Sequence, residues 1–191
     1  MQDIASKLQG LFAGEGKPRL YMGYYDRRRG TANFVGEPYH TGLIVAPKGA
    51  SLRTSTSGEV AMRLHATNSL WRNPTSGQVS MDWRYESKPT TIRTNALVGM
   101  IYLGKVVHHI ITSLEEFLVQ VPVVNNSPEW MCQHWVFDAL QLLRDKTIIC
   151  PFAGTPQDLW QIGKDSLLAR GVGRDIVVLD VNGREIPGSL A

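Results

Sequence analysis

Three side chains of this chain suit nucleophilic chemistry: one thiol and two imidazoles. Cys132 follows a serine and a proline at 127 and 128, a pair that favours a helix start, and apolar residues then recur at helical spacing to Leu143. We therefore predict a helix over residues 127–144, with Cys132 near its N-terminus on the packed face. A helix N-terminus stabilises a thiolate, so this position predicts a lowered thiol pKa.

The two histidines lie in two consecutive apolar segments, His40 in residues 39–46 and His65 in residues 60–67. Both segments are typical of strands, and neighbouring strands of one sheet would bring the imidazoles side by side. A thiol nucleophile needs a base, and a third group commonly orients that base. We therefore predict Cys132 as nucleophile, His40 as base and His65 as the orienting residue. If His65 is only structural, Asn68 or Glu86 is expected to orient His40.

Other polar and aromatic residues are candidates for supporting roles. The backbone N–H of Cys132 is a natural oxyanion donor, with the side chain of Gln133 or Tyr24 as a second donor. Trp130 is a candidate for the substrate pocket. His134 lies two residues after the cysteine, about 200° round a helix, so it should face away from the thiol and make a structural hydrogen bond.

The pattern of possible ligands argues against a metal or another cofactor. The chain has two cysteines and no CxxC or HxxxH spacing, and the Gly171 to Gly173 segment lacks the third glycine of a dinucleotide fingerprint. We therefore expect neither. His108 and His109 are interpreted as a solvated strand end.

The remaining patterns predict an α+β fold, in which an antiparallel sheet packs against helices. Beyond the two histidine segments, strands are expected at residues 19–25, 80–86, 96–106 and 174–181. Further helices are expected at 114–119, with Ser113 as its cap, and at 155–169. An amphipathic helix is predicted within residues 1–14, and a loop over 50–59. The length suits one domain, 1–191, with a core at about 19–145 and a C-terminal helix and strand extension at 150–191.

Composition narrows the class of protein. The 191 residues are 43% hydrophobic and 19% charged, with a formal net charge of +3, as in an ordinary globular protein. Two cysteines make no disulfide framework, and no segment matches a secretory signal or a bilayer span. The three arginines at 27–29 are too short a run to indicate nucleic-acid binding and favour a solvated loop. A cytoplasmic protein without nucleic-acid binding or stable membrane insertion is expected.

The histidine and cysteine segments together resemble a known family. His40 in Tyr-His-Thr-Gly-Leu-Ile-Val, His65 in Leu-His-Ala and Cys132 in Met-Cys-Gln-His-Trp-Val are similar to the circularly permuted NlpC/P60 branch of papain-like thiol enzymes, in particular its lecithin retinol acyltransferase (LRAT)-like group. The resemblance covers about residues 39–144 and implies a permuted NlpC/P60-like core. It also implies the catalytic roles given above. Met131 and Gln133 stand where the motif has asparagine and glutamate, and the spacing of the histidines is wider.

Two functions follow from these observations. The first is a cysteine-dependent hydrolase or acyltransferase that cleaves an amide, peptide or ester bond through a Cys132 acyl-enzyme, with a small molecule or peptide as substrate. The second is a non-catalytic module that binds a small molecule or a protein on the same fold, with tryptophans lining its pocket. A homodimer through the 114–119 helix or the C-terminal strand is compatible with either.

Overall fold

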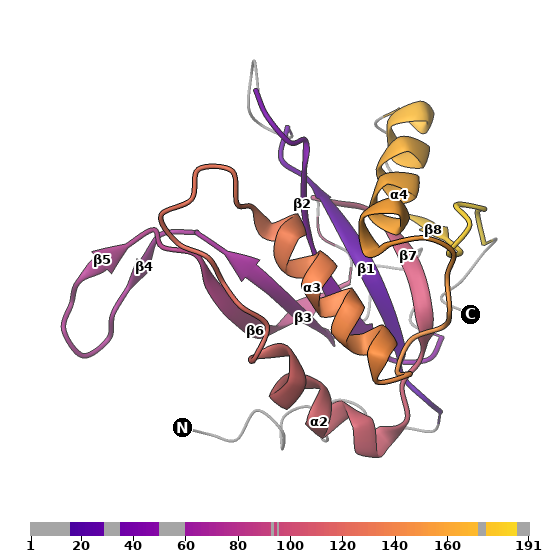
Figure 1. The fold of residues 1–191 in the computed structure, drawn as a ribbon, viewed down its shortest axis with the longest axis horizontal. Coiled ribbons are helices and arrows are strands. Elements are labelled where there is room, and N and C mark those ends of the chain that lie inside the picture. Colours follow the sequence, from indigo (N-terminus) through magenta and orange to yellow (C-terminus); the bar gives the residue numbers. More distant parts are fainter. Residues whose placement is uncertain are drawn as a thin grey trace.

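The computed structural model describes residues 16–28, 35–49, 60–92, 94, 96–171 and 175–186. Its centre is a six-stranded sheet (Figure 1) in the order β6-β3-β2-β1-β7-β8. The strands are β1 (Arg19–Asp26), β2 (Tyr39–Ala46), β3 (Val60–Thr67), β6 (Arg84–Thr91), β7 (Leu97–Lys105) and β8 (Val177–Leu179). Neighbouring strands are antiparallel except β7 and β8, which are parallel. A separate hairpin of β4 (Trp71–Arg72) and β5 (Val79–Ser80) projects away from this sheet.

Both faces of the central strands are buried. On β2, Leu43 and Val45 belong to the cluster that includes the helices, whereas Ile44 and Ala46 belong to a second cluster on the other face. Side chains alternate across a strand, so each apolar run supplies both clusters. The pairing of β1 with β2 is regular from Arg19 opposite Ala46 to Asp26 opposite Tyr39. This register sets the positions of the residues at the beginning of β2.

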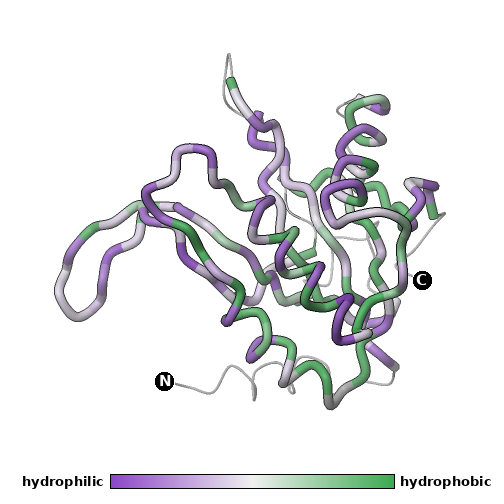
Figure 2. Tube along the Cα trace, in the orientation of Figure 1, coloured by the Kyte–Doolittle hydropathy of each residue, from purple (hydrophilic) through white to green (hydrophobic). Residues whose placement is uncertain are grey.

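In the part of the chain that the structure describes, three helices accompany the sheet: α2 (His108–Leu118), α3 (Cys132–Asp145) and α4 (Pro156–Arg170). Helix α3 contacts β2 and β3, and α4 contacts β7 and α3. Figure 1 shows α3 and α4 on the same side of the sheet. Hydrophobic and hydrophilic residues alternate along α3 (Figure 2), because one side of it is buried from Trp135 to Leu143 while the other side is half-buried, with Asp138 and Asp145 exposed. The sheet and this buried side hold the first residue of α3 in place.

The predicted α+β class with a mostly antiparallel sheet is confirmed, as are several elements. Strands 39–46 and 60–67 have the predicted bounds, β1 is one residue longer than predicted at its end, and β7 is one residue shorter at each end. Helix α4 follows Thr155, which accepts a hydrogen bond from the Asp158 N–H as its cap. These segments carry a clear period and clear end signals, so local sequence was enough to place them.

Two predicted helix starts were wrong. Helix α3 begins at Cys132 rather than Ser127, because residues 127–130 form a turn in which the Trp130 N–H donates to the Ser127 carbonyl (3.2 Å). Helix α2 begins at His108 rather than near Ser113. Its buried residues Ile111, Leu114 and Leu118 continue one helical stripe back toward the histidine pair, which therefore belongs to a helix and not to a strand end.

Two predicted strands were also displaced. The 80–86 segment is divided between β5, which ends at Ser80, and β6, which begins at Arg84. In the gap, the Trp83 N–H donates to Asn125 Oδ1 (2.7 Å) and Asn125 Nδ2 donates to the Trp83 carbonyl (3.0 Å). A side-chain amide thus takes the place of a neighbouring strand. The last strand is shorter than predicted. It comprises Val177–Leu179, which pair with three residues of β7.

Some predictions fall outside the described residues: the amphipathic helix within 1–14 and the 50–59 loop. Among the helices that the structure describes, none has the length and apolar character needed to span a membrane.

Candidate functional site

Cys132 is the first residue of α3 and its side chain is fully buried. Its sulfur accepts from the Thr41 backbone N–H (3.4 Å) and from Arg27 Nη2 (3.3 Å). The Thr41 hydroxyl lies 3.9 Å from the same sulfur. The predicted location, at a helix N-terminus and on the packed face, is therefore confirmed. Thr41 belongs to β2 and Arg27 follows β1, so the sheet supplies the surroundings of the thiol.

The predicted lowering of the thiol pKa is wrong. Burial raises the pKa of Cys132, because a thiolate loses its hydration there. The positive charge of Arg27 and the hydrogen bonds from Thr41 lower that pKa, but their combined effect is smaller. The thiol is therefore neutral at pH 7, and nucleophilic attack would require a base to remove its proton.

The two histidines lie side by side, as predicted. His40 Nε2 is 2.6 Å from His65 Nδ1, and His65 Nε2 is 3.3 Å from Glu86 Oε1. A carboxylate only accepts, so His65 donates from Nε2 to Glu86 and its Nδ1 accepts from His40 Nε2–H. His40 then carries its free lone pair on Nδ1. This chain of three residues leaves His40 in the tautomer that a base requires.

Both imidazoles are held neutral. Burial lowers the pKa of His40 well below its ordinary value. Repulsion from His65, in its protonated form, and from the guanidinium groups of Arg27 and Arg63 lowers that pKa further. Burial also lowers the pKa of His65, against the opposing hydrogen bond to Glu86. The hydrogen bond from His65 holds the pKa of Glu86 far below its usual range, with Lys88 contributing. At neutral pH the site thus contains a carboxylate and two uncharged rings.

The thiol and the histidine pair lie on different sides of β2. Thr41 faces the thiol, whereas His40 faces the opposite side with Tyr25, whose ring centroid is 6.0 Å from that of His40. Among the described residues, no hydrogen bond joins Cys132 to either histidine. Arg27 connects the two groups electrostatically, since its charge lowers the pKa of both Cys132 and His40. The structure therefore brings His40, His65 and Glu86 together on one side of β2, and places the thiol on the other side, against the next residue of that strand.

The other candidates have different positions. The thiol is 3.9 Å from Gln133 Oε1, so that amide lies beside the sulfur. Tyr24 is fully buried and its hydroxyl donates to the Trp160 carbonyl (2.8 Å), so it is no oxyanion donor.

Asn68 is exposed, and Glu86 contacts His65 rather than His40. Trp130 packs edge-on against Trp83, outside the thiol's contacts.

His134 has the structural role that was predicted. The Met131 N–H donates to its Nδ1 (2.9 Å), which closes the first turn of α3. Within the part of the chain that the structure describes, no group of three histidine, cysteine, aspartate or glutamate side chains could hold a metal ion.

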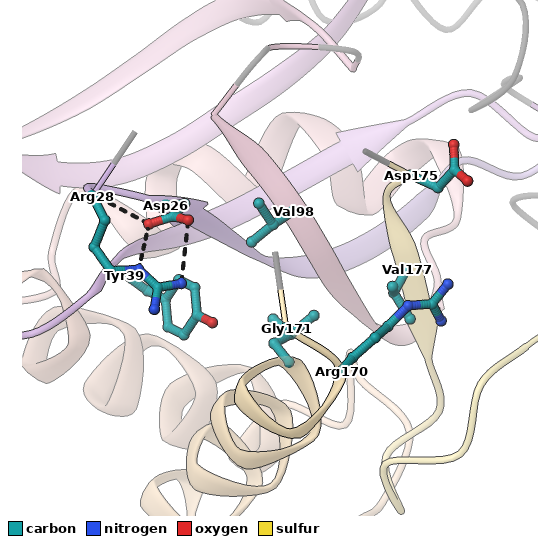
Figure 3. Close-up of a pocket in the computed structure, with 9 residues that line it drawn as sticks. Asp26, Arg28, Tyr39, Val98, Arg170, Gly171, Asp175 and Val177 are labelled. Atoms are coloured by element: carbon teal, nitrogen blue, oxygen red, sulfur yellow. Dashed lines mark hydrogen bonds and ion pairs between the residues drawn. The ribbon is translucent and has the colours of Figure 1, made fainter. Parts of the chain in front are cut away.

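Sequence reasoning missed Arg27 and Thr41, which both donate hydrogen bonds to the sulfur. Arg27 was interpreted as part of a solvated loop, and nothing in a run of three arginines distinguishes one member. Its neighbour Arg28 folds back onto the Asp26 carboxylate (2.9 Å), as Figure 3 shows. The cavity beside that pair measures about 10 Å³, space for one water molecule. Arg28 is therefore structural, and Arg27 alone of the two contacts the thiol.

Comparison with known proteins gives one match, to the family of unknown function DUF6914, over residues 17–165. No curated protein and no solved structure matches the chain. The matched region includes strands β1 to β7, helices α2 and α3, and α4 as far as Asp165. It also includes every residue of the site described above. The chain belongs to the DUF6914 family.

Proposed function

We propose that this protein is a cysteine-dependent hydrolase or acyltransferase with a circularly permuted NlpC/P60-like core of the LRAT-like type. It would cleave an amide, peptide or ester bond of a small molecule or peptide, with Cys132 as nucleophile and His40 as base. The observation that carries the proposal is the hydrogen-bonded series His40–His65–Glu86. His40 is next to Thr41, whose backbone N–H donates to the Cys132 sulfur.

The charges of the resting site define the first step. Cys132 and His40 are both neutral, so the thiol proton passes to His40 Nδ1 as sulfur bonds to the carbonyl carbon. His40 must turn toward the sulfur when substrate binds, because its ring faces the other side of β2. In the resting site, His65 and the Glu86 carboxylate hold the His40 ring in the tautomer whose Nδ1 is free to accept a proton.

The later steps follow from the same groups. The carbonyl oxygen becomes an oxyanion, for which the Cys132 backbone N–H in the first turn of α3 is a donor without an intrahelical acceptor. Collapse breaks the bond to the leaving amine or alcohol, which takes the proton from His40 and leaves a thioester on Cys132. Water, an amine or an alcohol then gives its proton to His40 and attacks the thioester, which releases the acyl group and restores the thiol.

Acylation by p-nitrophenyl acetate, measured by intact mass and peptide mapping, tests this function without knowledge of the natural substrate. Cys150 is exposed and serves as an internal control. We expect acetylation of Cys132 to be faster than that of Cys150 at pH 7–8. His40→Ala should slow the Cys132 reaction by about 10²-fold or more. Equal or faster labelling of Cys150, unaffected by His40→Ala, would contradict the proposal.

Arg27 provides a second, independent test of the thiol. Because its guanidinium lowers the pKa of Cys132, Arg27→Gln should raise that pKa and shift the pH profile of iodoacetamide alkylation upward. Arg28→Gln is the matched control, since Arg28 bonds to Asp26 instead. An unchanged profile in Arg27→Gln would show that the guanidinium does not act on the sulfur in solution.

One observation favours the alternative, a non-catalytic binding module: the thiol is fully buried and its pKa is raised. Such a cysteine packs as a small apolar residue. The acetylation experiment separates the two functions, because a binding module would leave Cys132 the slower of the two thiols.

A further inference from the structure

A groove runs along the outer side of α3, away from the sheet and from the thiol. Its volume is about 510 Å³, within the range of small-molecule sites. Trp130 from the turn before α3 forms one wall together with His134 and Phe137 of α3, and Pro156 and Gln157 from the start of α4 line the groove as well. None of these residues takes part in the proposed catalysis.

The aromatic wall is held in place by its neighbours. The Trp130 ring stacks on His134 with centroids 6.4 Å apart, and His134 meets Phe137 edge-on at 5.8 Å. Trp83 fixes Trp130 from its other side (5.1 Å), and the Met131 N–H fixes His134. The wall is therefore preformed, which reduces the entropy lost when a ligand binds.

The charges of the groove point to a cation. Asp138 lines it and is exposed, and none of the described residues that line it is a lysine or arginine. Six other aromatic rings of the described structure each have a lysine or arginine of the protein over them: Tyr25, Tyr39, Trp71, Phe117, Phe152 and Trp160. Among the described residues, the rings of Trp130 and Phe137 have none.

A neighbouring pocket shows the difference. Asp138 also lines this second pocket, of about 370 Å³, where Lys146 Nζ lies 4.3 Å from the Phe117 ring centroid. There the protein supplies its own cation beside the carboxylate and the ring. The larger groove is lined by the same aspartate together with Trp130 and Phe137, and among the described residues no lysine or arginine lies over those two rings.

We propose that the groove binds a small organic cation, an ammonium or guanidinium carried on an aromatic or aliphatic body. The body packs against Trp130 and Phe137, and the charge lies near Asp138, where cation–π attraction and the carboxylate act together. This site is independent of the Cys132 chemistry, and Cys132→Ala leaves it intact.

Two probes of the same shape test the charge requirement: 2-phenylethylammonium and the neutral 2-phenylethanol, titrated against full-length protein by NMR with the tryptophan indole N–H signals as readout. We expect the ammonium to bind about tenfold more tightly than the alcohol. Asp138→Asn should remove most of that difference. Asp165→Asn, an exposed acid on α4 outside the groove, should leave it unchanged.

Three results would overturn the proposal. They are equal affinity of the ammonium and the alcohol, absence of any shift with the ammonium at about 10 mM, and an equal loss of affinity in Asp138→Asn and Asp165→Asn. Cys132→Ala distinguishes this site from the proposed catalytic one, because it should abolish acetylation at residue 132 and leave the affinity for the ammonium unchanged.

Discussion

At the residue scale, burial decides the charge of the three groups proposed for catalysis. Cys132, His40 and His65 each lose solvent, and each is shifted toward its neutral form. Glu86 keeps its charge because it is only partly buried and accepts from His65. A neutral thiol and a neutral imidazole on opposite sides of β2 fit a mechanism in which proton transfer accompanies attack, rather than one that starts from a preformed ion pair.

The histidine pair predicts acid sensitivity of the fold. Both histidines have a lower pKa in the folded than in the unfolded chain, so below about pH 6.5 the unfolded chain binds more protons. The free energy of unfolding should therefore decrease as pH falls from 7 to 5, which thermal unfolding at each pH would measure. The double variant His40→Gln/His65→Gln should have a flatter dependence over this range. An equally steep dependence in the variant would assign the acid sensitivity to other groups.

At the element scale, α3 and α4 begin in different ways. Helix α4 has a reciprocal cap, in which the Asp158 N–H donates to Thr155 Oγ1 (3.1 Å) and the Thr155 N–H donates to Asp158 Oδ2 (2.7 Å). Helix α3 follows Met131, and the imidazole of His134 accepts from its N–H instead. An imidazole is an unusual partner in this position, which explains why sequence signals placed this start too early.

The cap of α4 gives a prediction for stability. Thr155→Ala removes the acceptor of the Asp158 N–H and should lower the free energy of unfolding by about 1 kcal/mol. Thr155→Ser keeps a hydroxyl and should stay within a few tenths of a kcal/mol of wild type. Urea unfolding followed by circular dichroism measures both. A similar loss in the two variants would mean that packing of the threonine methyl matters more than the hydrogen bond.

At the scale of the whole molecule, a glycine sets how closely α4 approaches the sheet. A Cβ at Gly163 would overlap the Tyr24 hydroxyl, and that hydroxyl donates to the Trp160 carbonyl one turn earlier in α4. Tyr24 has no exposed surface, so its ring has little room to move aside. The contact joins β1 to a helix more than 130 residues later in the chain.

Gly163→Ala should therefore destabilise the fold by about 1–3 kcal/mol, although alanine is the better helix former. Leu168→Ala, an exposed position of the same helix, is the control and should change the free energy of unfolding by less than about 0.5 kcal/mol. Denaturant unfolding of both variants measures this difference. A stabilised Gly163→Ala protein would show that helix propensity outweighs the overlap with Tyr24.

The amino-acid sequence by itself determined much of the fold. The strand bounds of β2 and β3, the helical run from Cys132 and the start of α4 follow from local periodicity and end signals. It also identified His134 as structural, because two residues turn a helix through about 200°. These features depend on neighbours within a few residues, which a single sequence contains.

Only the tertiary structure decided the surroundings of the site. The guanidinium on the thiol comes from Arg27, 105 residues away, and the partner of the Tyr24 hydroxyl lies 136 residues away. The sign of the thiol pKa shift depends on complete burial, which the helix position did not reveal. The packing of α3 on the Thr41 side of β2 leaves the thiol and His40 on opposite sides of that strand. Contacts between distant segments and the loss of solvent arise from how the elements pack together, and no local pattern in the chain encodes either.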